Sequence, residues 1–276
     1  MTTPRLKRSI LGAVGGAALL ILTAGAAQAT CIGTCGTDTA NGDVTNPPGF
    51  SSYHFVTTTG GPAAGGNLPS VFGSPGVNST NGSTFTTAPF TATAGDSVNF
   101  YFNYVTSDGS GFPDYAWAAL LSTTGGQNYL IFTAQTQPSG NTVPGKTMPP
   151  LASGASLVPP TSPITLGSGT KGPGGAGGPV WAELGSWSGY CFAAGCGLTG
   201  WIQSLFDGEA ADTYVLEFGV SNTNDTLYDS GLAYAGVTVG GKPIDTPEPG
   251  GLALFGAGLF AVLLGYRLAR RRQITG

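Results

Sequence analysis

The chain has 276 residues, and only 9% of them are charged, far below the ~25% of a typical globular domain. Between residues 30 and 246, three basic residues stand against thirteen acidic ones, a net charge of −10. So few cations cannot neutralise phosphates, which excludes nucleic-acid binding and disfavours attraction to anionic lipid headgroups. The 14 Phe, 10 Tyr and 4 Trp are nevertheless too many for a disordered chain.

Residues 1–29 have the pattern of a secretory signal peptide. Three basic residues precede an uncharged apolar run over residues 10–24, which predicts a signal helix. Ala27 and Ala29 then supply small side chains at the two positions that signal peptidase reads. We therefore expect export across the inner membrane and cleavage before Thr30.

Residues 30–246 are expected to form one exported domain, rich in strands. Apolar and polar or aromatic residues alternate over residues 98–105 and around residues 214–220, as in strands with one buried face. The weaker strand candidates are residues 51–58, 83–93, 115–122, 128–135, 199–206 and 232–239. Many short strands without amphipathic helices predict an all-β, antiparallel β-sandwich of the jelly-roll type.

Residues 137–180 interrupt this pattern. They contain nine prolines and ten glycines among 44 residues, a composition that should not sustain a strand ladder. We expect a long Pro/Gly-rich loop over the sandwich or a partly disordered insertion.

Four cysteines, Cys31, Cys35, Cys191 and Cys196, allow three pairings. Export favours two disulfides, most simply the local pairs Cys31–Cys35 and Cys191–Cys196, while crossed pairs stay open. A zinc site with four thiolates is the rival, but metal knuckles usually have two residues between cysteines, and here there are three and four.

Catalytic motifs are scarce. His54 is the only histidine, which excludes H-E-x-x-H zinc sites and centres with several histidines. No G-x-S-x-G elbow, P-loop or dinucleotide fingerprint is present. We interpret His54 as a structural residue of an early strand.

Aspartates on two loops are the main source of chemistry. Asp108 and Asp114 flank one short loop, and Asp225 and Asp229 flank another. If the loops meet at one end of the sandwich, their oxygens are suited to Ca²⁺, which is a possible cofactor of the exported domain. Turn aspartates also cap their own backbone, and Asp229 can satisfy buried amides. A glycosidase-like carboxylate pair among Asp108, Asp114 and Asp229 is a further alternative.

Aromatic side chains suggest a glycan site, because the apolar faces of sugars stack on such rings. Trp187 and Tyr190 precede the second cysteine pair, and Tyr115 and Trp117 lie in an earlier strand candidate. The alternative is that these rings fill the core, where aromatic side chains dominate the packing energy.

The C-terminal residues 247–276 combine three features. Pro-Glu-Pro precedes an uncharged apolar run over residues 250–266, and an arginine cluster follows it. As a helix, that run would be ~25 Å long, marginal for spanning the inner membrane, with the arginines held in the cytoplasm. The motif residues are Pro247, Glu248 and Pro249, and the cluster includes Arg270, Arg271 and Arg272.

These three features in this order resemble the PEP-CTERM sorting signal of exopolysaccharide-producing Gram-negative bacteria. The resemblance implies an exosortase, a membrane-embedded cysteine transpeptidase, that acts at or near the Pro-Glu-Pro motif. An ordinary single-pass anchor would share the topology but keep its tail. Most of the middle also resembles secreted β-sandwich proteins that carry this tail, through residues 94–96, 105–109, 114–118 and 228–233. That likeness implies architecture and localisation and is silent on chemistry.

The sequence thus predicts an exported protein that is transiently anchored in the membrane and finally lies at the cell surface or in the extracellular matrix. We expect a non-enzymatic protein that associates with exopolysaccharide, as in a biofilm. A calcium-assisted module that binds carbohydrate or protein is the alternative, and a glycan-active enzyme is the third.

Overall fold

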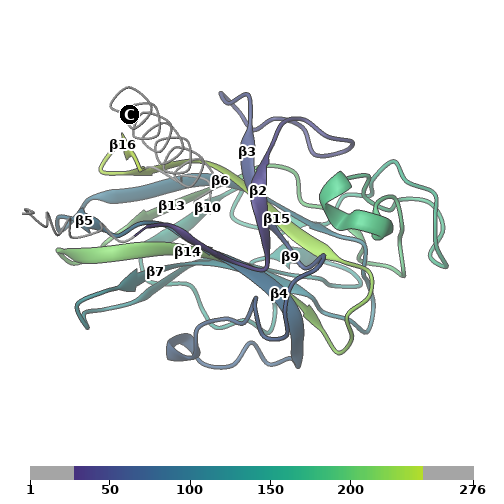
Figure 1. Ribbon diagram of the computed structural model, residues 1–276, viewed down its shortest axis with the longest axis horizontal. Coiled ribbons are helices and arrows are strands. Elements are labelled where there is room, and N and C mark those ends of the chain that lie inside the picture. The colour runs from purple at the N-terminus through teal and green to yellow at the C-terminus, as the bar shows by residue number, and fades with distance from the viewer. Residues whose placement is uncertain (1–27, 245–276) are drawn as a thin grey trace, which may run out of the picture.

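The computed structural model describes residues 28–244, which form two packed antiparallel sheets (Figure 1). The predicted sorting tail lies outside the described residues, as does the predicted signal peptide except for its last two residues. The predicted cleavage before Thr30 would leave strand β1 (Thr30–Ile32) at the new N-terminus. Within residues 28–244, no helix has the length and apolar character needed to cross a membrane.

The first sheet has six strands: β1, β4 (Ser79–Thr86), β5 (Phe90–Ala92), β7 (Tyr115–Ser122), β8 (Tyr129–Gln135) and β14 (Asp212–Thr223). The second has eight: β2 (Thr34–Asp38), β3 (Tyr53–Thr57), β6 (Ser97–Thr106), β10 (Ala155–Val158), β12 (Gly197–Leu198), β13 (Ile202–Asp207), β15 (Ser230–Val239) and β16 (Lys242–Pro243). The remaining elements are a ribbon of β9 (Asn141–Val143) and β11 (Ser162–Pro163) and the 3-10 helices η1 (Ser70–Phe72) and η2 (Ala182–Trp187).

The strand order brings distant parts of the chain together. The first sheet runs β1-β4-β14-β7-β8, with β5 beside β14, and the second runs β10-β13-β6-β15-β3-β2, with β12 beside β6 and β16 beside β15. Eight of the strands form nested antiparallel pairs: β3 with β15, β4 with β14, β6 with β13, and β7 with β8. Because β6 and β15 are also antiparallel neighbours, with Thr106 opposite Ser230, the loops after β6 and β14 lie at the same end of the sandwich.

The main core lies between the sheets and is built from the alternating positions that the sequence shows. Phe102 of β6 meets Phe132 of β8, with ring centroids 3.8 Å apart. Phe218 of β14 stacks on Tyr234 of β15 at 3.9 Å. The predicted strands over residues 98–105 and 214–220 are thus confirmed, and they face each other across the core.

Loops also bury parts of both outer faces. On the eight-stranded sheet, Tyr53 and Phe55 of β3 lie under Trp181, whose indole N–H donates to the Tyr53 hydroxyl at 3.0 Å. On the six-stranded sheet, a second outer cluster includes Leu68 and Met148 from loops. Each sheet is therefore partly apolar on both faces.

Two predictions about chain organisation are wrong in detail. The Pro/Gly-rich stretch contains three short strands: β9 and β11 pair with each other, and residues 155–158, which include neither Pro nor Gly, pair with four residues of β13 as strand β10. Residues 83–93 form two strands instead of one: β4 ends at Thr86 and β5 begins at Phe90, and Pro89 between them has no N–H for a ladder.

Candidate functional site

The two aspartate-bearing loops meet at one end of the sandwich. The Ser107 N–H donates to the Asp229 carbonyl at 3.1 Å. The Asn224 side-chain amide donates to the Gly111 carbonyl, also at 3.1 Å. The contact between loops that the calcium hypothesis requires is therefore present.

Asp114 is fully buried, and both of its carboxyl oxygens have hydrogen-bond partners. Its Oδ1 accepts a hydrogen bond from the Thr223 N–H at 2.8 Å, and its Oδ2 accepts one from the Ser230 hydroxyl at 2.7 Å. Burial, together with the nearby charges of Asp108 and Asp225, raises the pKa of Asp114 well above its usual value. The carboxyl therefore joins β14 and β15 to the start of β7 as a structural tie.

Asp108 is 1% exposed and only half satisfied. Its Oδ1 accepts from the Gly109 N–H at 2.7 Å, whereas its Oδ2 has no hydrogen-bond partner within residues 28–244. Burial raises the pKa of Asp108 to about 8, despite the Gly109 hydrogen bond, and the Asp225 charge adds to the rise. A protonated Asp108 is the physical consequence near neutral pH.

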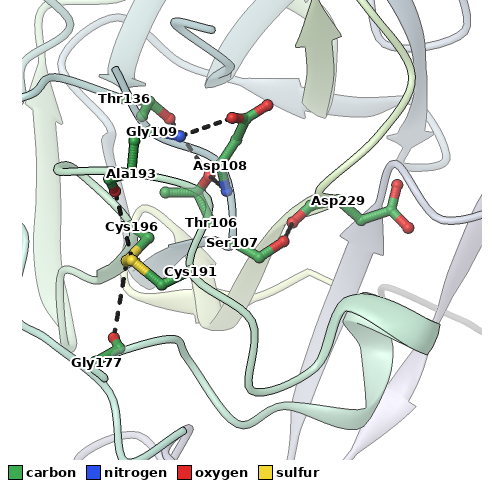
Figure 2. Close-up of a disulfide and its surroundings, with 10 residues drawn as sticks. All are labelled: Thr106, Ser107, Asp108, Gly109, Thr136, Gly177, Cys191, Ala193, Cys196 and Asp229. Carbon is green, nitrogen blue, oxygen red and sulfur yellow. Dashed lines mark hydrogen bonds between the residues drawn. A yellow bond between two sulfur atoms is a disulfide. The ribbon is translucent and has the colours of Figure 1, made fainter. Parts of the chain in front are cut away.

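Asp229 and Asp225 serve other partners. The Asp229 carboxylate accepts from the hydroxyls of Thr58 at 2.8 Å and Thr59 at 2.9 Å, and burial raises its pKa. Figure 2 shows its side chain extending away from Asp108. Asp225 accepts from the Leu227 N–H at 2.9 Å and so caps its own turn. Among the described residues, no group of three or more His, Cys, Asp or Glu side chains is placed to hold a metal ion.

The structure forms both local disulfides, Cys31–Cys35 and Cys191–Cys196. The second lies beside the aspartate loops (Figure 2), where the Phe192 N–H donates to the Ser107 carbonyl at 2.9 Å. A Cβ on Gly109 would lie 2.4 Å from the Ala193 carbonyl oxygen, so only glycine permits this approach. The disulfide loop is therefore the third segment of this end.

The glycan prediction is wrong for Tyr115 and Trp117. Both are 0% exposed and lie in the outer cluster of the six-stranded sheet. The Tyr115 hydroxyl is 2.7 Å from the Ser79 hydroxyl, and the Trp117 indole N–H donates to the Gly66 carbonyl at 3.1 Å. A loop over this face occupies the rings, so they cannot stack on a sugar.

Trp187 and Tyr190, by contrast, are partly exposed and belong to a larger group. With Phe112, Phe192 and Tyr228, all partly exposed, they form what we call the aromatic strip. Neighbouring ring centroids along it lie between 4.3 and 5.6 Å apart. Sequence reasoning missed the three added rings, although Phe112 and Tyr228 lie on the aspartate loops and Phe192 lies between the paired cysteines.

His54 has a structural environment in β3. Its Nδ1 lies 3.1 Å from the Thr37 hydroxyl, and its ring stacks on Tyr234 with centroids 5.6 Å apart. The two contacts join β2, β3 and β15, as expected of a structural histidine.

A surface hollow of about 510 Å³ lies elsewhere, and its lining includes Phe72, Asn128 and Asp207. Asn128 and Asp207 adjoin the ends of β8 and β13 that are remote from the aspartate loops, and no predicted site residue lines the hollow. Comparison of the chain with protein-family models, curated proteins and solved structures finds no match.

Proposed function

We propose that the chain is an exported, non-enzymatic protein of the cell surface or extracellular matrix that associates with exopolysaccharide. The partly exposed aromatic rings beside the Cys191–Cys196 disulfide carry this proposal, since they are held on fixed loops and keep part of their surface accessible. Two local disulfides agree with an oxidising compartment, and hence with export.

A non-enzymatic role is supported by the state of the candidate catalytic acids. Asp108, Asp114 and Asp229 are at most 7% exposed. Each accepts hydrogen bonds from the protein's own hydroxyl or N–H groups. A glycosidase acid must reach the glycosidic oxygen from an open cleft, and these carboxyls lie beneath the surface.

The jelly-roll topology is part of the same proposal. Nested pairing of eight strands, first with last and inward to the central hairpin, is what two successive Greek keys produce. Lectin domains are among the proteins that use this architecture, so the fold is compatible with sugar binding, by analogy only.

Polysaccharide association is tested by electrophoresis of the purified exported protein through native gels that contain the host's exopolysaccharide. We expect retardation that increases with polymer concentration, because ring stacking slows migration without any charge attraction. An unrelated acidic protein of similar size is the control. Unchanged mobility in gels of the host polymer and of a panel of other polymers would contradict the proposal.

Removal of the sorting tail is tested by mass spectrometry of the mature protein. We expect a mass that corresponds to a C-terminus near Pro247–Pro249, because an exosortase would cut at the Pro-Glu-Pro motif. Such a protein lacks Arg270, Arg271 and Arg272. A Glu248→Ala variant should keep the arginines. A wild-type protein that retains them would show that the segment is a permanent anchor.

Calcium-assisted binding is the second candidate, favoured by one observation. Asp108 Oδ2 is buried without a partner among the described residues, and the Asp225 carboxylate lies close enough to affect its charge. Buried charges are usually paired or bound to metals. Calcium would have to displace the Asp108 proton, so this candidate requires Ca²⁺ binding that strengthens as the pH rises.

A further inference from the structure

We propose that the aromatic strip is the binding face for a neutral polysaccharide. This inference rests on the proposed association with polysaccharide and assigns its site and ligand class. It differs from the sequence-based prediction in its residues, because Tyr115 and Trp117 are replaced by Phe112, Phe192 and Tyr228.

The strip is continuous although its rings come from separate segments. Phe112 and Phe192 have ring centroids 5.3 Å apart, Phe192 and Tyr228 4.9 Å, and Tyr228 and Trp187 4.3 Å. Tyr190 completes it at 5.6 Å from Trp187. The five rings thus form one unbroken series of contacts and each is partly exposed, so successive sugar units of one polymer chain would have several neighbouring rings to contact.

The loops that carry the rings are fixed before any ligand arrives. The Ser110 N–H donates to the Ala194 carbonyl at 2.9 Å, which ties the Phe112 loop to the disulfide loop. Tyr228 has φ of 53°, a left-handed conformation that is strained for a residue with a large side chain. A strained backbone that places a ring on the surface points to a role for that ring outside the fold, and a preorganised face loses little entropy on binding.

Exposed neutral polar side chains that suit sugar hydroxyls occur near the strip aromatics in the chain. Ser110, Ser186, Asn224 and Thr226 are exposed and lie within a few residues of strip aromatics in the chain. Their hydroxyl and amide groups donate and accept without carrying charge. Rings for the apolar sugar faces and neutral polar groups for the hydroxyls together match a carbohydrate.

Charge selects a neutral polymer. Within residues 28–244 the cationic side chains are Lys146, Lys171 and Lys242, against twelve acidic ones, two of which are buried carboxyls with strongly raised pKa values. Lys171 lies at the strip, 5.6 Å from the Tyr190 ring centroid. A uronate-rich chain would therefore meet one cation at the strip and a domain whose remaining acids still outnumber its cations. The same acidic charge opposes a second copy of this chain as the occupant.

The test is affinity electrophoresis in gels containing neutral polymers (a β-glucan and a galactomannan) or anionic ones (alginate and polygalacturonate). We expect the purified exported protein to be retarded by a neutral polymer. Trp187→Ala and Tyr228→Ala should each weaken that binding by about tenfold or more, as loss of a central aromatic contact does. Phe50→Ala removes a ring that is 44% exposed elsewhere and should leave binding unchanged.

Melting temperatures identify any variant that fails to fold, and Trp187→Phe, which keeps a ring, should retain part of the affinity. If a polymer retards the wild type and both alanine variants equally, the strip is not the binding face, while the proposed function stands. Retention only by anionic polymers would overturn the neutral-ligand assignment. If the wild type forms a dimer and Trp187→Ala is monomeric, the strip is the interface with a second copy of this chain and not a polysaccharide site. Failure of the wild type to bind any polymer, including the host's, would instead remove the proposed function itself.

Discussion

Replacing Asp114 with alanine is expected to lower the free energy of unfolding by about 2–6 kcal/mol, because two buried hydrogen-bonding groups lose their partner at about 1–3 kcal/mol each. The groups are the Thr223 N–H and the Ser230 hydroxyl, at 2.8 and 2.7 Å from the carboxyl oxygens. Thr223 ends β14 and Ser230 begins β15, so the loss falls where the two sheets meet the loops. Urea denaturation at pH 7 measures it.

Asp114→Asn is the matched control, and we expect it to change stability by less than about 1.5 kcal/mol, the net worth of one ordinary hydrogen bond. The raised pKa of Asp114 favours the neutral carboxyl, the state that an amide resembles. Ser230 Oγ also lies 2.7 Å from Thr106 Oγ1, so its single proton serves only one of these two contacts. The amide that the Asp114→Asn substitution introduces, like a protonated carboxyl, can donate to Ser230 while its oxygen accepts from Thr223. Equal damage from both substitutions would show that the site holds an ionised carboxylate.

Strands were predicted from the sequence where burial is one-sided or composition is distinctive. The segment 115–122 coincides with β7, and residues 98–105 match β6 within one residue at each end. A period of two reports which side chains share a face, because successive side chains of a strand point to opposite sides. It does not report what covers that face. Trp117 lies on an outer face that a distant loop closes, so its burial was invisible to local pattern.

Non-local pairing explains the missed strand β10. Four residues, Ala155–Val158, join the sheet through β13, which lies more than forty positions further along the chain. Composition averaged over residues 137–180 reflects its nineteen Pro and Gly residues and hides a short segment free of both. The local disulfides were predictable for the opposite reason, since each joins cysteines only four or five positions apart.

At the candidate site too, local features were predictable from the sequence and contacts between distant segments were not. The sequence marked both aspartate loops as interesting but could not show that Asp114 points inward to Ser230 while Asp225 caps its own turn. Three of the five strip rings were missed because no short motif links them. Phe112 and Phe192 become neighbours, with centroids 5.3 Å apart, only when the disulfide loop docks on the loop after β6.

The free energy of unfolding is expected to fall as the pH rises from about 4 to about 8. The pKa of Asp108 is about 8 in the folded protein and near 4 when unfolded, so between these values the folded state keeps a proton that the unfolded state releases. Each such group lowers stability by about 1.4 kcal/mol per pH unit in this window. Asp114, whose pKa is also raised by burial and by Asp108, acts in the same direction. The lowered pKa values of Asp96 and Asp212, which are partly exposed, affect stability only below this range.

Urea denaturation of the purified protein at pH 4 to 9 measures this slope, and Asp108→Asn should make it shallower because one titrating group is removed. A stability that increases over the same range, as salt-bridged carboxylates produce, would contradict the protonated state assigned to Asp108. Repeating the series with Ca²⁺ separates the two candidate functions. An ion that entered beside Asp108 Oδ2 would displace its proton, so Ca²⁺ would stabilise the wild type most at pH 9 and Asp108→Asn hardly at all. Equal stability with and without Ca²⁺ would show that no ion binds at Asp108 Oδ2 and that the carboxyl simply stays protonated. That result would remove the calcium-assisted alternative.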